Sequence, residues 1–169
     1  MNPIKTILHA TDFSAHSQHA LALACALARD QKARLIVLHA VPVPAVVTGG
    51  PDKLAIRRAE RSEQDLKDYR EEMRTKLRQL PLPGLPLAVE RLLKEGDVPT
   101  VILRTAEETS SDLILLGTHG WTAEARRLLG SVAEEVSQKS RCPVVTVKVP
   151  LAQPQSAKQP EPEEAGVIL

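Results

Sequence analysis

Aromatic residues are almost missing from this sequence, which has one Phe, one Tyr and one Trp among 169 residues. Proteins that read single-stranded nucleic acid stack the bases on aromatic rings, and this chain has almost none to offer. An excess of one charge is missing too, because 22 Lys and Arg nearly balance 21 Asp and Glu. A formal net charge of +1 creates no overall field that would draw the chain to DNA or to an acidic membrane. We therefore expect neither nucleic acid nor membrane as a partner.

Cysteines and long apolar runs are also scarce. Cys25 and Cys142 lie far apart and have no metal-ligand spacing, so we expect inert thiols. No apolar run approaches the roughly 18 residues that a membrane span needs. No signal peptide is visible, because Lys5 and then the polar pair Thr11-Asp12 interrupt the N-terminal segment. We expect a cytoplasmic protein.

The composition predicts one domain followed by a tail. Apolar residues make up 43% of the chain, enough for a packed core over residues 1–149. After Pro150, Gln, Pro, Glu, Ala and Lys dominate. Such a segment cannot bury enough apolar surface to offset its ordering entropy, so we expect residues 150–169 to be a disordered C-terminal tail.

Short apolar runs alternate with segments of helical periodicity. The run Arg34–Val41 (RLIVLHAV) is almost continuously apolar, as in strands that are buried on both faces of a parallel sheet. Ser14 and Asp97 are expected helix N-caps, and the charged stretch 52–80 is expected to be a solvated helix with a thin apolar stripe. The pattern predicts an α/β fold, a five-stranded parallel sheet with helices on both faces, in a Rossmann-like sandwich. The expected strands are 4–10, Arg34–Val41, 87–94, 112–116 and 144–149.

A glycine-spaced segment follows the fourth expected strand. Gly117 and Gly120 are followed by Gly130 and Ser131, and glycines let backbone amides approach an anion closely. The sequence from Ser131 to Glu134 (SVAE) matches a capping box, which predicts a helix that begins at Ser131 and offers its N-terminus to phosphate. The alternative is a turn and a cap without a ligand, and the residues alone leave both open.

Ligands of open parallel sheets bind beyond the carboxyl ends of the strands, at the point where strand order reverses. Asp12 ends the first strand there, where its carboxylate would accept hydrogen bonds from a ribose or help to hold a metal on the phosphates. A turn or helix-start role is the alternative for Asp12. Val41 ends the second strand, and its backbone would read an adenine edge, an interpretation that rests on position alone.

Histidines provide a further alternative. His9, His39 and His119 would form a metal site if they met, but their spacing is not a ligand motif and structural roles are favoured. His16 and His19 fall on the first helix and are expected to face solvent. The sequence has no P-loop motif, no Gly-x-Gly-x-x-Gly after the first strand and no nucleophile elbow.

The chain resembles the universal stress protein family over about residues 4–149. The family pattern Gly-x2-Gly-x9-Gly-(Ser/Thr) is met by Gly117, Gly120, Gly130 and Ser131. The flanking text RLLGSVAE, TDFS after the first strand and CPV before the last strand are also similar to the family. Trp121 and Glu124 depart from the small or basic residues of many relatives, which puts the affinity for phosphate in question more than the site.

The resemblance implies an adenine nucleotide alpha hydrolase-like fold that binds ATP, with Mg²⁺ as an accompanying ion and no separate metal site. It also implies a homodimer formed through the last strand, from Val144 to Val149. By carry-over, Asp12 and Val41 contact the adenosine, and the glycine backbones with Ser131 hold the phosphates. The full set of expected cofactor-binding residues is Ala10, Thr11, Asp12, Val41, Gly117, Thr118, His119, Gly120, Gly130, Ser131 and Val132.

Three functions follow from these observations. The first is an ATP-binding, nucleotide-sensing regulatory module in stress response. The second is a slow ATPase, for which His119 and Asp12 are the only candidate bases near the expected phosphates; the sequence assigns no catalytic residue. The third is a nucleotide-free dimer that binds protein partners.

Overall fold

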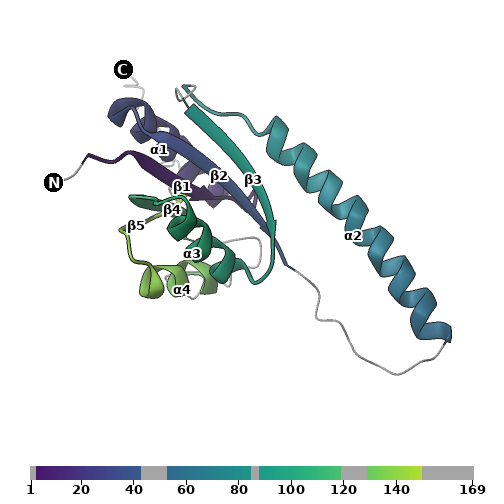
Figure 1. Ribbon diagram of the computed structural model, residues 1–169. Helices are drawn as coiled ribbons and strands as arrows, with labels where there is room; N and C mark the ends of the chain where they lie inside the picture. The colour runs from purple at the N-terminus through teal and green to yellow at the C-terminus, as the bar shows by residue number, and fades with distance from the viewer. Residues whose placement is uncertain (1–2, 43–52, 85–87, 119–128, 150–169) are drawn as a thin grey trace, which may run out of the picture.

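The computed structural model describes residues 3–42, 53–84, 88–118 and 129–149, with the backbone alone for 53–62. Strands and helices alternate along the chain (Figure 1). Each of the first four strands is followed by a helix, which confirms the α/β class. The elements are β1 (Thr6–Ala10), α1 (Ala15–Gln31), β2 (Arg34–Val41), α2 (Lys53–Gln79), β3 (Ala88–Glu95), α3 (Val98–Glu108), β4 (Leu113–Gly117), α4 (Ser131–Lys139) and β5 (Val144–Val147).

The strands form one parallel five-stranded sheet in the order β3-β2-β1-β4-β5. The first strand is therefore central, between β2 and β4. The direction in which successive strands are added reverses there, since β2 and β3 lie on one side of β1 and β4 and β5 on the other. This reversal is the switch point at which open α/β sheets bind ligands.

Successive apolar residues of each strand point to opposite faces of the sheet and form a core on each face. Ile7, Leu35 and Val37 pack with α1 and the C-terminal end of α2, whereas Leu8 and Ile36 pack with α3 and α4. Both faces are thus covered, which explains why the central strands are apolar at nearly every position. The prediction of helices on both faces is confirmed.

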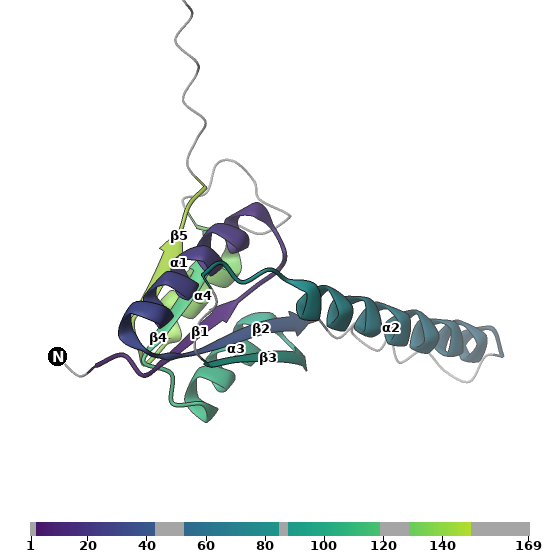
Figure 2. The same ribbon diagram turned by 90° about the horizontal axis from the view of Figure 1, so that it is seen from above.

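Helix α2 is only partly packed on the sheet. Its C-terminal residues Met73 and Leu77 are buried, while Tyr69 is 40% exposed. Its N-terminal part extends beyond the sheet in both views (Figures 1 and 2). The prediction of a largely solvated, charged helix is confirmed for the described side chains, which carry the ion pairs Lys76–Glu72 and Arg74–Glu71.

Several predicted boundaries are shifted. β1 begins at Thr6 rather than residue 4, and β3 and β4 each begin and end one residue later than expected. β5 ends at Val147, so the expected last strand from Val144 to Val149 is too long by two residues. At that end Thr118 N–H donates to the Val147 carbonyl, and Val149 N–H donates to His16 Nδ1 instead of continuing a strand ladder.

No helix among the described residues is long and apolar enough to cross a membrane. The disordered tail expected for residues 150–169 lies outside the described residues.

Candidate functional site

The loop after β1 is tied to β2 by its backbone. Thr11 N–H donates to the Leu38 carbonyl at 2.8 Å, and Thr11 Oγ1 accepts from Phe13 N–H at 3.0 Å. The half-buried Asp12 accepts from Ser14 N–H at 2.9 Å through Oδ1. The turn role considered for Asp12 is therefore real. It leaves Asp12 at the carboxyl end of the central strand, where the sequence places it.

Ser14 ends this loop and begins α1. Its side chain accepts a hydrogen bond from Ser17 N–H at 3.2 Å, so Ser14 is the N-cap that the sequence predicts. The same helical turn is also bonded to the loop, because Thr11 Oγ1 lies 3.1 Å from Ser17 Oγ. The loop and the first turn of α1 thus form one hydrogen-bonded unit.

Two buried histidines lie behind this loop. His9 Nδ1 is 3.1 Å from the Leu115 carbonyl oxygen, and His39 Nδ1 is 2.7 Å from that of Thr11. Burial lowers the pKa of His9 to about 4, against the raising effects of the Leu115 hydrogen bond and of Asp12. Burial also lowers the pKa of His39, opposed in the same way by the hydrogen bond to Thr11 and by Asp12. Both rings are therefore neutral at pH 7.

These contacts favour the structural interpretation of His9 and His39 over a metal site. Within the described part of the chain, no three His, Cys, Asp or Glu side chains gather as metal ligands would. His119, the third member of the alternative, lies outside the described residues, as does Gly120. His19 is exposed on α1 as predicted.

The prediction for His16 is wrong. Its ring does not simply face solvent, because Nδ1 lies 3.2 Å from Thr118 Oγ1 and accepts from Val149 N–H at 3.3 Å. Thr118 itself is buried and follows Gly117 at the end of β4. His16 therefore joins α1, the first residue after β4 and the residues after β5.

Gly117 is required by packing. A Cβ at this position would lie 2.8 Å from the carbonyl carbon of His16 and from Ser17 N, both backbone atoms of α1. The absence of a side chain lets the end of β4 approach the first turn of α1. For Gly117 the structure thus provides a packing reason, which is neither the phosphate contact nor the ligand-free turn that the sequence left open.

The N-terminus of α4 has no side-chain cap. Helix α4 begins at Ser131 as predicted, but its N-cap is Gly130, with φ −70° and ψ 158°, so the predicted capping box with Ser131 as the cap is wrong. The Gly130 amide donates to the Thr118 carbonyl at 2.7 Å, which ties the helix start to the end of β4. The amides of Ser131 and Val132 belong to the first turn of this helix, the part whose N–H groups have no partner within the helix and which favours an anion.

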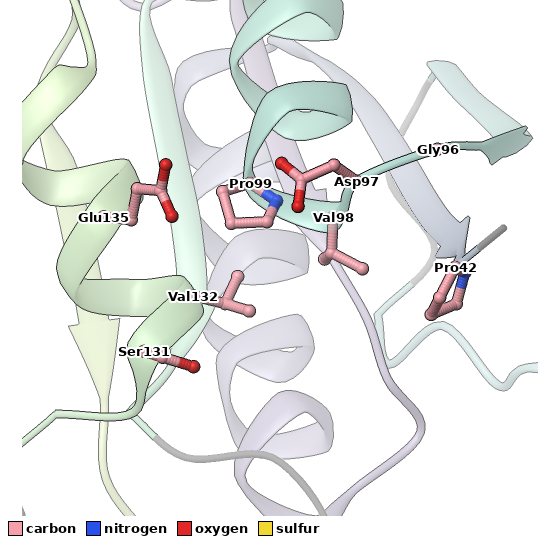
Figure 3. Close-up of a pocket in the computed structure, with 8 residues that line it drawn as sticks. All are labelled: Pro42, Gly96, Asp97, Val98, Pro99, Ser131, Val132 and Glu135. Atoms are coloured by element: carbon pink, nitrogen blue, oxygen red, sulfur yellow. The ribbon is translucent and has the colours of Figure 1, made fainter. Parts of the chain in front are cut away.

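A cavity of about 450 Å³ opens beside this helix start. Figure 3 shows Ser131, Val132 and Glu135 of α4 on one side, with Val98 and Pro99 of α3 and its N-cap Asp97 facing them. Pro42 after β2 and Gly96 after β3 complete its lining. Of the expected cofactor-binding residues, Ser131 and Val132 line this cavity. The other described members, Ala10, Thr11, Asp12, Val41, Gly117, Thr118 and Gly130, do not.

The cavity brings in residues that the sequence did not single out as binding residues. Gly96 N–H donates to the Val41 carbonyl at 3.0 Å, and Gly96 has φ +140°, a conformation that L side chains rarely adopt. Val41 itself is buried at the end of β2. The turn at Gly96 brings the start of α3 beside β2, and a glycine followed by the cap Asp97 was the available sequence signal.

The two carboxylates of the cavity already have partners. Asp97 caps α3 by accepting from Thr100 N–H and Thr100 Oγ1, and these hydrogen bonds hold its pKa below the usual range. Glu135 accepts from Lys139 Nζ at 2.6 Å. The cavity therefore combines apolar walls, a helix N-terminus and two carboxylates that already accept hydrogen bonds from Thr100 and Lys139.

Comparisons with known proteins match this architecture. Residues 3–148 match the universal stress protein family. A universal stress protein of Thermus aquaticus, encoded in the 3′ region of a sulfhydrylase gene, is 36% identical over 147 residues, which cover 85% of this chain and 98% of that protein. The solved structure of MJ0577 of Methanocaldococcus jannaschii is 29% identical, with a TM-score of 0.67, and covers 89% of this chain and 100% of that one.

Two further structures were solved with ligands. A universal stress protein in complex with cAMP has a TM-score of 0.56 at 22% identity and covers 87% of this chain and 98% of that one. A universal stress protein of Archaeoglobus fulgidus in complex with dAMP has a TM-score of 0.50 at 24% identity and covers 88% of this chain and 100% of that one. At these identities the likeness establishes the shared fold.

Proposed function

This chain belongs to the universal stress protein family, and from that premise we propose that it binds an adenine nucleotide at the carboxyl edge of its sheet. ATP is the ligand that we propose first. The bound state would make the protein a nucleotide-sensing regulatory module of the cytoplasmic stress response. Solved relatives in complex with cAMP and dAMP support an adenine ligand class.

The observation that carries the proposal is the open N-terminus of α4 beside the cavity. A helix start without a side-chain cap holds several N–H donors and the positive end of the helix dipole. Ser131 and Val132 line the cavity at that start, so phosphate oxygens bound there would receive N–H hydrogen bonds. The function proposed for this helix start is phosphate binding.

The rest of the cavity suits the nucleoside. Pro42, Val98, Pro99 and Val132 provide apolar walls, and a volume of about 450 Å³ lies within the usual range for small-molecule sites. Asp12 does not line the cavity but lies after the central strand, where we propose that it accepts hydrogen bonds from the ribose of a ligand that extends beyond the cavity. Mg²⁺ would arrive bound to the phosphates, since Asp97 and Glu135 are engaged by Thr100 and Lys139.

The test is equilibrium binding of ATP, AMP and cAMP to the purified protein, measured by isothermal titration calorimetry. Ser131→Glu would place a carboxylate among the first-turn amides, where it satisfies the helix dipole and repels phosphate. We expect it to weaken ATP binding at least tenfold without loss of thermal stability. Ser131→Gln, of the same size and without charge, is the matched control and should bind within about threefold of the wild type.

The proposal fails if none of the three nucleotides binds saturably at millimolar concentration. Equal affinity of the Ser131→Glu and Ser131→Gln proteins would remove the helix start from the site. A preference for AMP or cAMP over ATP would retain the adenine site and reject ATP as its ligand.

We also propose a homodimer formed through β5. This strand is at one edge of the sheet, with its outer backbone groups open to pairing, and Val145 on it is 36% exposed. Val145→Glu should convert a dimer into a monomer in light scattering after size exclusion, because two strands paired across a two-fold axis place the new charges near each other. A monomeric wild-type protein at micromolar concentration would contradict this assignment.

A further inference from the structure

Two adjacent residues of β2 hold both polar backbone groups of Thr11. The Thr11 N–H donates to the Leu38 carbonyl at 2.8 Å, and the Thr11 carbonyl lies 2.7 Å from His39 Nδ1. A carbonyl oxygen only accepts, so the neutral ring of His39 carries its proton on Nδ1. The peptide that precedes Asp12 is thus fixed from the neighbouring strand.

The same imidazole supports the next residue of the loop. The ring centroids of Phe13 and His39 are 4.6 Å apart, with the rings tilted by 39°. Phe13 has φ +65°, the left-handed conformation that is unfavourable for a bulky side chain. Such a conformation persists only where the surroundings impose it, and here the His39 ring and the hydrogen bond from Phe13 N–H to Thr11 Oγ1 do so.

His9 is the natural comparison. Both imidazoles are buried on the same face of the sheet, and in both cases Nε2 has no partner among the described atoms. The Nδ1 of His9, however, faces the Leu115 carbonyl of β4 and not the loop. Both residues are therefore buried imidazoles, but His9 contacts β4 and His39 contacts the loop after β1.

We propose that His39 is a positioning residue for nucleotide binding, which fixes the Asp12 carboxylate by holding the Thr11 carbonyl on one side of it and the Phe13 ring on the other. The inference rests on the proposed function, because it assumes that Asp12 binds the ribose of the nucleotide. His39 acts through the loop and does not itself contact the ligand.

Four variants test the role of His39. His39→Leu keeps an apolar contact for Phe13 and removes the donor. His39→Asn places an amide N–H near the position of Nδ1, whereas His39→Gln places it near the position of Nε2. If the Leu variant does not fold, the Asn and Gln variants are compared with each other. His9→Leu is the matched control for the loss of a buried imidazole. Each protein is measured for ATP affinity by calorimetry and for amide hydrogen exchange at Phe13 and Ser14 without nucleotide.

We expect His39→Leu and His39→Gln to raise the Kd about tenfold and to accelerate exchange at Phe13 and Ser14, because a buried carbonyl then lacks its partner. We expect His39→Asn to stay within about threefold of the wild type and His9→Leu to leave the Kd unchanged. Equal affinities of the Asn and Gln variants, or equal effects of His9→Leu and His39→Leu, would overturn the inference. If the wild type binds no nucleotide, the proposed function fails separately, and unchanged exchange in the His39 variants would still reject the positioning role.

Discussion

Gly117 belongs to the glycine pattern of the family, and it is also required by packing. The end of β4 approaches the first turn of α1 so closely that a Cβ would lie 2.8 Å from two backbone atoms. Backbone atoms cannot rotate away as a flexible side chain can, so relief requires a shift of the helix. The motif glycines are therefore not equivalent in what they contribute to this protein.

We predict that Gly117→Ala lowers the free energy of unfolding by about 1–3 kcal/mol, the usual cost of overpacking a tight contact. Urea unfolding followed by circular dichroism measures it. Gly130→Ala is the control, because φ −70° at Gly130 suits any residue and its expected loss is smaller, at most about 1 kcal/mol. Equal losses for the two variants would show that the contact with His16 and Ser17 is not limiting.

Sequence reasoning at this scale succeeds where the interaction is local. Ser14 and Asp97 are followed by helices and bond to amides three residues on, so the short pattern contains the whole interaction. It fails where the partner is distant. His16 was expected to face solvent, and its ring instead meets Thr118 and Val149, which are more than 100 residues away.

The helices differ in how their N-termini are finished. α1 and α3 have side-chain caps from Ser14 and Asp97, whereas α4 begins after Gly130 without one. The two capped helices have their first-turn amides partly satisfied within the protein. Among the described residues no side chain caps α4, and this is the helix whose start lies beside the cavity at Ser131 and Val132.

We predict that Ser14→Ala destabilises the protein by about 1 kcal/mol, because the buried Ser17 N–H loses its acceptor. Ser14→Asp keeps an acceptor at the N-cap and should retain more of the stability. Thermal unfolding of the three proteins at pH 7 compares them. A Ser14→Ala protein as stable as the wild type would mean that another group takes over the cap.

Element boundaries were predictable to the extent that packing is uniform along a strand. β2 has its predicted bounds because apolar residues on both faces continue to Val41, where Pro42 follows. β5 was predicted too long because Lys148 and Val149 continue its alternating pattern. The Val149 N–H, however, donates to His16, a partner that no local pattern contains. The cavity needed segments around Gly96 and Ser131 to meet, which only the folded arrangement provides.

The whole molecule contains a built-in sensitivity to acid. His9 is fully buried and its pKa is lowered to about 4, while an unfolded histidine titrates near 6.5. Between these values the unfolded chain binds a proton that the folded chain does not. The contribution to stability is therefore complete above about pH 6.5 and is lost as the pH falls toward 4.

We predict that this loss amounts to about 3 kcal/mol by pH 4 for His9, with His39 acting in the same direction. Urea midpoints at about pH 7.5, 6.0, 5.0 and 4.5 would trace it. The stability of the His9→Leu protein should fall less steeply as the pH falls. The decrease that remains comes from the carboxylates, which titrate in both proteins. Parallel profiles for the two proteins would show that His9 titrates normally in the folded state.

The central place of β1 also dictates the order in which the sheet can be assembled. One edge of β1 pairs with β2, which follows after a single helix, but the other pairs with β4, and the contact of His9 with Leu115 spans 106 residues. During synthesis β1 therefore leaves the ribosome long before β4, the strand that completes its pairing. Closing so long a loop before its contacts form is entropically costly, and the docking of β4 against β1 is the step that we expect to limit the folding rate.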